Sequence, residues 1–236
     1  MTREQVYGRR PVREALRGPR EVLELWATER AVASETWLAD GPRVHVKPDR
    51  ELGEAARTRD HQGVLAWCEP YRYADAHELV LDERPLLACL DQVTDPRNLG
   101  AVIRSAEGAG ATGVVLPAHG SARVTAAVCR ASAGAVEHLP VAVVPNLARY
   151  LNEIKRGDLW IYAASAEAEQ DLWTADLSGG LALVFGAEGK GVRPLVRRAC
   201  DATVSIPLAG HVESLNVSVA AALLLYEARR RQRLHG

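Results

Sequence analysis

The stretch LLACLDQVTDPRNLGAVIRSA, residues 86–106, decides the fold. It opens with an apolar run that ends at Asp91, and a short run without polar alternation is typical of a strand buried on both faces. Asp95 and Pro96 then mark a turn. After the turn, apolar residues recur at helical spacing, at Leu99, Val102, Ile103 and Ala106. The stretch therefore predicts a strand, a turn and a helix with one buried face.

Similar apolar runs follow along the second half of the chain, with helical patterns between them. They lie at Gly113–Pro117, Pro140–Val144, Leu159–Ala164, Leu181–Phe185 and Thr203–Ile206. This alternation predicts an α/β fold in which right-handed crossovers build a parallel sheet covered on both faces. Ligands bind such sheets at the carboxyl ends of the strands. A last helix is expected from Ser214 to about Gln232.

A smaller α/β pattern precedes this sheet. Between Arg9 and about Pro70 we expect helices at 11–17, 34–39 and 51–59 and strands at 21–28, 44–47 and 63–68. Proline and polar residues interrupt the pattern from Glu69 to Glu78. The chain is therefore predicted to contain a small domain over residues 1–70, a linker over 71–83 and the larger domain over 84–236.

Composition excludes several classes of protein. With 47% hydrophobic and 25% charged residues, the 236-residue chain can build an ordered core. It has no apolar run long enough to span a bilayer and no secretion signal, so a cytoplasmic protein without membrane contact is expected. The four cysteines and seven histidines are dispersed, which predicts buried free thiols and no metal site.

Charge is uneven along the chain although the net charge is only −1. Basic residues gather at the N-terminus, at Arg3, Arg9, Arg10, Arg13, Arg17 and Arg20, and again in the run from Arg229 to Arg233. Phosphate binding requires basic surface, so RNA is a possible partner. The second cluster has a simpler explanation, because arginines in a last helical turn complement the helix dipole.

Three polar segments lie where strands are predicted to end. The first is Asp95–Ala106, in which Asn98 can cap a helix and Arg104 lies opposite the apolar stripe, although it could simply pair with Glu107. The second is Phe185–Gly191, and the third runs from Ile206-Pro207 through Ser214–Ser218. In the last of these, Ser214 is expected to cap the final helix. Because strand ends of one parallel sheet share an edge, the three segments are predicted to form one site.

The glycine segment GAEGKG, residues 186–191, narrows the choice of ligand. Its G-x-x-G-x-G order reverses the dinucleotide fingerprint, and it lacks the G-K-[ST] of a phosphate-binding loop. A nicotinamide oxidoreductase or an ATPase is therefore disfavoured. Glycines after a strand still allow the backbone to approach a ligand closely, and an ordinary tight turn is the alternative.

Together, the three segments resemble the motifs of the SpoU/TrmH branch of the SPOUT methyltransferases, over roughly residues 85–233. The resemblance is strongest to members that methylate a guanosine ribose in large-subunit ribosomal RNA. Tyr7-Gly8 and His61-Gln62-Gly63 also fit that subgroup. The resemblance implies methyl transfer from S-adenosylmethionine to a ribose 2′-hydroxyl, an N-terminal RNA-binding domain of ribosomal-protein type, a trefoil knot and a homodimer. His211 and Glu213 differ from the small residues common there.

The resemblance also implies roles for individual residues. It implies a catalytic group of Asn98, Arg104, Glu188, Ser214 and Asn216. It implies a cofactor site built from Gly186, Gly189, Gly191, Ile206, Pro207, Leu208 and Leu215. Arginine side chains have reference pKa values above about 12.5. We therefore expect Arg104 to stabilise a negative oxygen as a fixed cation rather than to act as a base.

Alternative functions remain open from the sequence. One is a 2′-O-methyltransferase with a tRNA target or with a resistance-type ribosomal RNA target. Another is a catalytically silent RNA-binding protein of ribosome assembly. The silent alternative is disfavoured because all five residues of the implied catalytic group are present in the chain.

Overall fold

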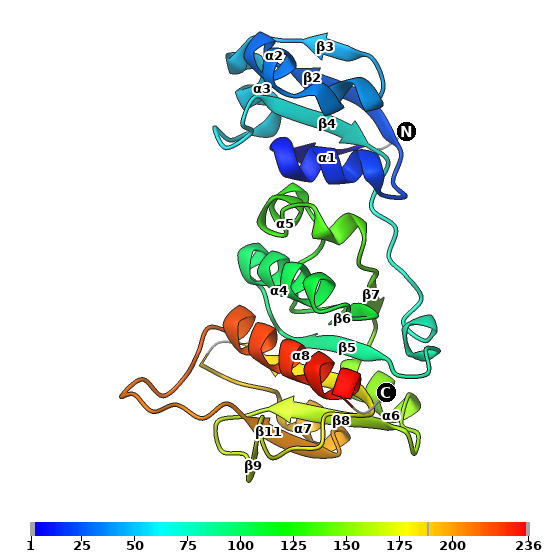
Figure 1. Ribbon diagram of the computed structural model, residues 1–236, viewed down its shortest axis with the longest axis vertical. Helices are drawn as coiled ribbons and strands as arrows, with labels where there is room; N and C mark the ends of the chain where they lie inside the picture. Colours follow the sequence, from blue (N-terminus) through cyan, green and yellow to red (C-terminus); the bar gives the residue numbers. More distant parts are fainter. Residues whose placement is uncertain (1–2, 188, 235–236) are drawn as a thin grey trace. The chain divides into compact units, whose positions relative to one another are not determined.

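The computed structural model of the chain describes residues 3–187 and 189–234 (Figure 1). Its residues form two compact units. One contains the chain up to Arg72 together with Arg123–His138, and the other contains Tyr73–Ala122 and Leu139 onwards. The domain boundaries predicted near residues 70 and 84 stay predictions. In the described part of the chain, no helix combines the length and apolar character needed to cross a membrane.

The first unit is built on a four-stranded sheet of order β1-β4-β2-β3. Its strands are β1 (Glu4–Tyr7), β2 (Val22–Ala27), β3 (Val44–Val46) and β4 (Val64–Cys68). β4 runs antiparallel to β1 and β2, and β3 pairs parallel to β2. Its helices are α1 (Arg9–Arg17), α2 (Glu29–Ser34) and α3 (Asp49–Ala56). The sequence did not predict β1.

The helix expected at residues 34–39 was placed too late. The structure has α2 at Glu29–Ser34, followed by a 3₁₀ helix at Thr36–Asp40. Thr28 starts α2 early because its hydroxyl accepts a hydrogen bond from the backbone N–H of Ala31, at 3.2 Å. The chain leaves the helical conformation at Glu35, where φ is −118° and ψ is 90°.

The segment Arg123–His138 packs within the first unit. It contains α5 (Ala126–Ala131) and a 3₁₀ turn at Ala135–Glu137. The buried carboxylate of Glu137 forms an ion pair with the guanidinium of Arg20, and the Sγ of Cys129 lies 3.6 Å from the same guanidinium. This buried ion pair ties the segment to the rest of the unit.

The second unit contains a seven-stranded sheet in which every pair of neighbours is parallel. Its order is β7-β6-β5-β10-β8-β11-β9. The strands are β5 (Leu86–Asp91), β6 (Gly113–Pro117), β7 (Val141–Val144), β8 (Leu159–Ala164), β9 (Gln170–Asp171), β10 (Gly180–Gly186) and β11 (Ala202–Ser205). The predicted α/β fold with a parallel sheet is confirmed, and β9 is the strand that the sequence did not predict.

Helices cover both faces of this sheet. α4 (Pro96–Gly108) and α8 (Val217–Leu234) pack together, with α8 against β5 and β10, and α6 (Leu147–Glu153) packs with α7 (Pro194–Ala199). Leu87 and Cys89 of β5 belong to the core beneath α6 and α7. Since successive strand residues point to opposite faces, Leu86, Ala88 and Leu90 are buried on the other face. This two-sided burial explains the unbroken apolar run of β5.

The order of the strands reverses between β5 and β10. From β5 the chain first builds outward through β6 and β7, and it later returns to place β10 against the other side of β5. Asp91, the last residue of β5, pairs with Gly186, the last residue of β10. In parallel sheets, ligands bind outside the carboxyl ends of the strands at such a reversal. The trefoil knot implied by the resemblance stays a prediction.

Candidate functional site

Two adjoining cavities lie at the carboxyl edge of the sheet in the second unit. The larger, of about 690 Å³, is lined mainly by residues 163–167, 185–187, 189–192 and 213–217, with Ile206 and Leu208. It therefore combines residues at or after the carboxyl ends of β8, β10 and β11. The second and third polar segments therefore lie together at this edge, as their positions after strand ends predicted.

The smaller cavity, of about 400 Å³, lies at the ends of β5 and β10. It is lined by Gln92, Val93, Thr94, Asp95, Asn98, Gly120, Ala187, Lys190 and Val217. Ala187, Lys190 and Val217 also line the larger cavity. The two cavities thus share a wall, so that ligands in them would meet at the loop after β10 and at the start of α8.

The backbone around Gly186 leaves no space for a side chain at this position. A Cβ atom at this position would lie 2.0 Å from the carbonyl carbon of Gly191 and 2.2 Å from the backbone N of Val192. The loop returns this closely because the N–H of Gly191 donates to the carbonyl of Ala187, at 2.9 Å. Gly189 and Gly191 have φ values of 73° and 64°, which favour glycine. The glycine segment is therefore a tight turn that also forms a cavity wall.

The end of this loop is held by a buried carboxylate. Asp91 has no solvent exposure, and its Oδ2 accepts a hydrogen bond from the backbone N–H of Arg193, at 2.9 Å. Its Oδ1 lies 2.7 Å from the Nη2 of Arg193. Arg193 immediately precedes α7, whose first residue is Pro194. The sequence reasoning missed this pair, which joins residues 102 positions apart.

Asn98 and Asn216, from the first and third segments, are in direct contact. The Nδ2 of Asn216 donates a hydrogen bond to the Oδ1 of Asn98, at 3.1 Å. Asn98 lines the smaller cavity and Asn216 the larger one. This hydrogen bond therefore lies where the two cavities adjoin.

Both predicted helix caps were assigned to the wrong residue. α4 begins at Pro96, and its cap is Asp95, whose Oδ1 accepts from the N–H of Arg97 at 2.8 Å. α8 begins at Val217 rather than at Ser214, and the Oδ1 of Asn216 accepts from the N–H of Ser218 at 2.9 Å. In each case a residue directly before the helix outcompetes the predicted one. Asn98 is thereby available to bind Asn216.

The remaining residues of the implied catalytic group do not all lie at the cavities. Ser214 is exposed and lines the larger cavity. Arg104 is exposed on α4 and lines neither cavity. It forms no ion pair with Glu107 among residues 3–187 and 189–234. Glu188 lies outside the described residues.

The implied cofactor residues gather at the larger cavity with one exception. Gly186, Gly189, Gly191, Ile206, Leu208 and Leu215 line it, whereas Pro207 does not. Residues 163–167, at the end of β8 and directly after it, also line this cavity and were not predicted. The signal was present, because β8 was a predicted strand of the same parallel sheet and its carboxyl end must reach the same edge.

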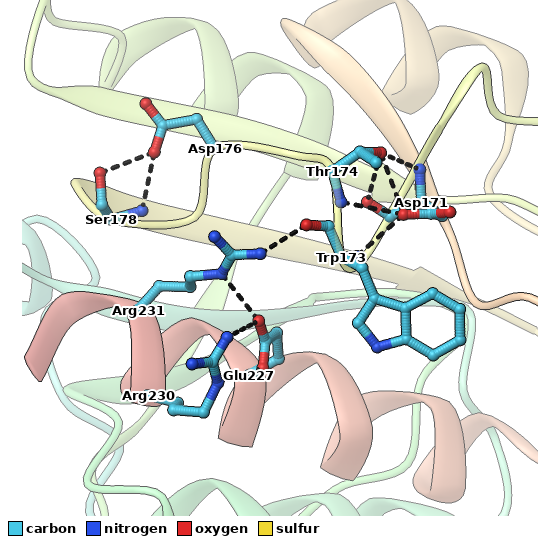
Figure 2. Close-up of polar contacts among 8 residues, drawn as sticks. All are labelled: Asp171, Trp173, Thr174, Asp176, Ser178, Glu227, Arg230 and Arg231. Carbon is cyan, nitrogen blue, oxygen red and sulfur yellow. Dashed lines mark hydrogen bonds and ion pairs between the residues drawn. The ribbon is translucent and has the colours of Figure 1, made fainter. Parts of the chain in front are cut away.

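The basic end of α8 is occupied by structural contacts. The guanidinium groups of Arg230 and Arg231 both bind the carboxylate of Glu227, and Arg231 also donates to the carbonyl of Trp173 (Figure 2). These contacts lower the pKa of Glu227 to about 2, the hydrogen bond from Arg230 being the main cause. Arg229 donates to the carbonyl of Ala109 at the end of α4, at 2.9 Å. The cluster thus anchors α8 rather than presenting three free cations.

The cysteines are not candidates for nucleophilic chemistry. All four are free, and Cys68, Cys89 and Cys129 are buried, as predicted, whereas Cys200 is partly exposed. Burial raises the pKa of the Cys129 thiol to about 12, so this thiol stays protonated near neutral pH. In the described ranges, no three histidine, cysteine or acidic side chains gather as a metal ion would require.

Two protein families match successive parts of the chain. Residues 85–226 match the SpoU rRNA Methylase family, and residues 5–74 match the family described as RNA 2′-O ribose methyltransferase substrate binding. The chain is 40% identical to the 23S rRNA (guanosine-2′-O-)-methyltransferase RlmB of Pseudomonas putida, over 98% of each chain. It is 39% identical to the putative TrmH family tRNA/rRNA methyltransferase YacO of Bacillus subtilis, over 96% of this chain and 95% of that protein.

The fold of this chain is also similar to that of a solved SpoU methyltransferase structure. The SpoU methyltransferase AviRb from Streptomyces viridochromogenes, in complex with the cofactor AdoMet, superposes with a TM-score of 0.82. The two chains are 29% identical, and the match covers 99% of this chain and 91% of AviRb.

Proposed function

The chain belongs to the SpoU rRNA methylase family, and we propose on this basis that it transfers a methyl group from S-adenosylmethionine to a ribose 2′-hydroxyl of RNA. One observation carries the proposal. The three polar segments meet at two adjoining cavities that share Ala187, Lys190 and Val217. A methyl donor and a methyl acceptor have to be held side by side, and two cavities with a common wall suit that requirement.

The larger cavity fits the cofactor. Its wall includes the cradle at Gly186, where any side chain would collide with the returning backbone. Its volume of about 690 Å³ is within the range of small-molecule sites. When bound, S-adenosylmethionine supplies a methyl group on a positively charged sulfur. The chain itself has to hold the acceptor oxygen in line with that methyl group and accommodate the proton that the hydroxyl loses.

Asn98 and Asn216 are suited to positioning the acceptor. Their hydrogen bond joins the two cavities, so it fixes both amides near the point where the hydroxyl would meet the methyl group. Ser214 lines the larger cavity and can donate or accept a hydrogen bond there. We assign Glu188 to the same group on the family resemblance alone.

Arg104 is proposed to act from a second copy of the chain. It lines neither cavity of its own subunit, although it is exposed on α4, next to α8. α8 presents an exposed apolar stripe of Val219, Leu223 and Tyr226, at helical spacing. A homodimer built on this stripe would cover the apolar surface and bring Arg104 of one copy toward the cavities of the other. There the guanidinium would stabilise the developing negative oxygen as a fixed cation.

The proposed target is a guanosine of 23S ribosomal RNA, as in the name of the RlmB relative. The first unit is proposed to bind the RNA, since residues 5–74 match a substrate-binding family. α1 exposes Arg10, Arg13 and Arg17 along one side, which suits contact with phosphates. Such a target would place the protein in the cytoplasm. The name of the YacO relative, a tRNA/rRNA methyltransferase, keeps tRNA as the second candidate.

The experiment that tests this function is a comparison of RNA from cells with and without the gene. Mapping of 2′-O-methylation should show one guanosine in 23S RNA that loses its methyl group when the gene is deleted. The purified protein with S-adenosylmethionine should restore that methyl group in vitro. Loss of a tRNA methyl group would favour the second candidate, and an unchanged map of both RNAs would contradict the enzymatic function.

A further inference from the structure

Asp91 is a buried carboxylate in a strand that is otherwise apolar. It ends β5, the run Leu86–Asp91, and it has no solvent exposure. Burying a charged carboxylate costs several kcal/mol in general unless hydrogen bonds and an opposite charge compensate it. An apolar side chain at this position would not carry this desolvation cost. A specific interaction of the carboxylate should therefore explain its presence.

Among residues 3–187 and 189–234, the Asp91 carboxylate forms its hydrogen bonds and its ion pair with Arg193 alone. The backbone N–H of Arg193 donates to Oδ2 and its Nε donates to Oδ1, each at 2.9 Å. The side chain of Arg193 is 44% exposed, so it reaches inward from the surface to bind Asp91. The carboxylate therefore holds both the main chain and the side chain of the residue that precedes α7.

The two ends of the loop between β10 and α7 are thereby attached to the end of β5. At the first end, Gly186 pairs with Asp91 in the parallel ladder. At the second end, Arg193 is bound by the Asp91 carboxylate. Within the loop, the N–H of Gly191 donates to the carbonyl of Ala187. One residue of β5 thus sets the position of both ends of a tight glycine loop.

This loop forms walls of both cavities. Ala187 and Lys190 line each of them, and Gly189, Gly191 and Val192 line the larger one. A displacement of the loop would change the shape of the larger cavity first, because more of its wall comes from the loop. Rigid attachment of a binding loop reduces the ordering cost of binding.

We propose that Asp91 is a positioning residue that fixes the cofactor loop 186–193 through Arg193 and so sets the affinity for S-adenosylmethionine. The inference rests on the proposed function, since it takes the larger cavity as the cofactor site. Asp91 acts through Arg193 and the loop and does not touch the reacting atoms. Its loss should therefore weaken cofactor binding while leaving the methyl-transfer step and RNA binding nearly unchanged.

Asp201 offers a matched control in the same unit. Its Oδ2 accepts from the N–H of Ile161 at 3.0 Å, and its Oδ1 lies 2.8 Å from the Nζ of Lys155. It thus combines a backbone bond and an ion pair as Asp91 does. It precedes β11, at the amino end of that strand, and lines neither cavity. Asp201→Asn should therefore destabilise the fold without changing the affinity for the cofactor.

The test compares Asp91→Asn, Arg193→Gln and Asp201→Asn with the wild type. Calorimetry with S-adenosylmethionine should give a Kd raised about tenfold or more by Asp91→Asn and severalfold by Arg193→Gln, while Asp201→Asn stays within about twofold. The double variant Asp91→Asn with Arg193→Gln should bind no more weakly than Asp91→Asn, because both changes remove one interaction. In turnover, KM for the cofactor should rise and kcat at saturation should persist.

Hydrogen exchange gives a readout that needs no ligand. Backbone amides in a peptide spanning residues 186–193 should exchange faster in Asp91→Asn and Arg193→Gln than in the wild type or in Asp201→Asn. Wild-type cofactor affinity in the Asp91 and Arg193 variants would overturn the inference, and so would a fall in kcat with unchanged KM. A wild-type protein that binds no S-adenosylmethionine would instead overturn the proposed function on which the inference rests.

Discussion

Asn216 donates a hydrogen bond from its Nδ2 to the Oδ1 of Asn98, at 3.1 Å. The bond connects the residue directly before α8 with the first turn of α4, 118 positions apart in sequence. Asn216 also receives the N–H of Ser218 on its Oδ1. The same amide therefore caps a helix with its oxygen and orients Asn98 with its nitrogen, so the functional role proposed for it is compatible with its structural one.

Removing either amide should slow methyl transfer. Asn98→Ala and Asn216→Ala should each lower kcat about 100-fold, the order found when one preorganised polar group is lost from an active site. The double variant should be little slower than either single variant, since the two side chains act as a pair. Single-turnover methylation of the RNA substrate measures this effect. Strictly multiplicative losses would show that the two amides act independently.

A methyl group at Gly186 should abolish cofactor binding. The Cβ of Gly186→Ala would lie 2.0 Å from the carbonyl carbon of Gly191, so the loop would have to move away from the cavity. Gly210→Ala is the control, because a Cβ there meets nothing within 4 Å. Calorimetry with S-adenosylmethionine should detect no binding to the first variant and near wild-type binding to the second. Normal binding to Gly186→Ala would show that the loop is not part of the cofactor site.

The proposed dimer can be tested on α8. Leu223 is 44% exposed in the middle of the apolar stripe, so Leu223→Lys should place a charge in the proposed interface and favour the monomer. Leu81→Lys is the control, because Leu81 is 74% exposed elsewhere in the unit. Light scattering after gel filtration should report twice the chain mass for the wild type and the control. A monomeric wild type, or a dimer that survives Leu223→Lys, would contradict the proposed interface.

Complementation tests which copy supplies Arg104. Arg104→Ala and Asn216→Ala should each be nearly inactive alone. If Arg104 acts in the partner's site, mixed dimers contain one intact site, and an equal mixture should regain about a quarter of wild-type activity. Methylation assays before and after subunit exchange measure the gain. Persistent inactivity of a mixture shown to contain mixed dimers would place Arg104 in the site of its own copy.

Acid should remove the stabilisation that comes from Glu227. Its pKa is lowered to about 2 in the folded chain by Arg230 and Arg231, so its ion pairs stabilise the fold above the ordinary carboxylate pKa. This contribution is lost as the pH falls from about 4.5 toward 2. Glu227→Gln should lower the free energy of unfolding by about 1 kcal/mol at pH 7, with a smaller deficit at pH 3. Urea unfolding at both pH values measures it, and a deficit that grows at low pH would contradict this assignment.

The sequence alone determined the elements with strong local signals. β5, β6 and β8 have the predicted bounds because unbroken apolar runs between polar turns can be buried only within a sheet. The sequence also predicted that the three polar segments lie at one edge of the sheet, because the carboxyl ends of parallel strands share an edge. The strands β1 and β9 were missed, because Glu4–Tyr7 begins with two polar residues and Gln170–Asp171 is polar throughout, so neither contains an apolar run.

Tertiary structure alone decided which polar side chains meet. Several residues near each helix start could serve as the cap, and local spacing favoured Asn98 and Ser214, whereas the folded chain uses Asp95 and Asn216. The pairing of Asp91 with Arg193 could not be read from the sequence either, because it depends on β10 inserting beside β5. Local patterns specify strands and turns through short-range sterics and burial. Contacts between distant residues depend on the order of the strands, which those patterns do not encode.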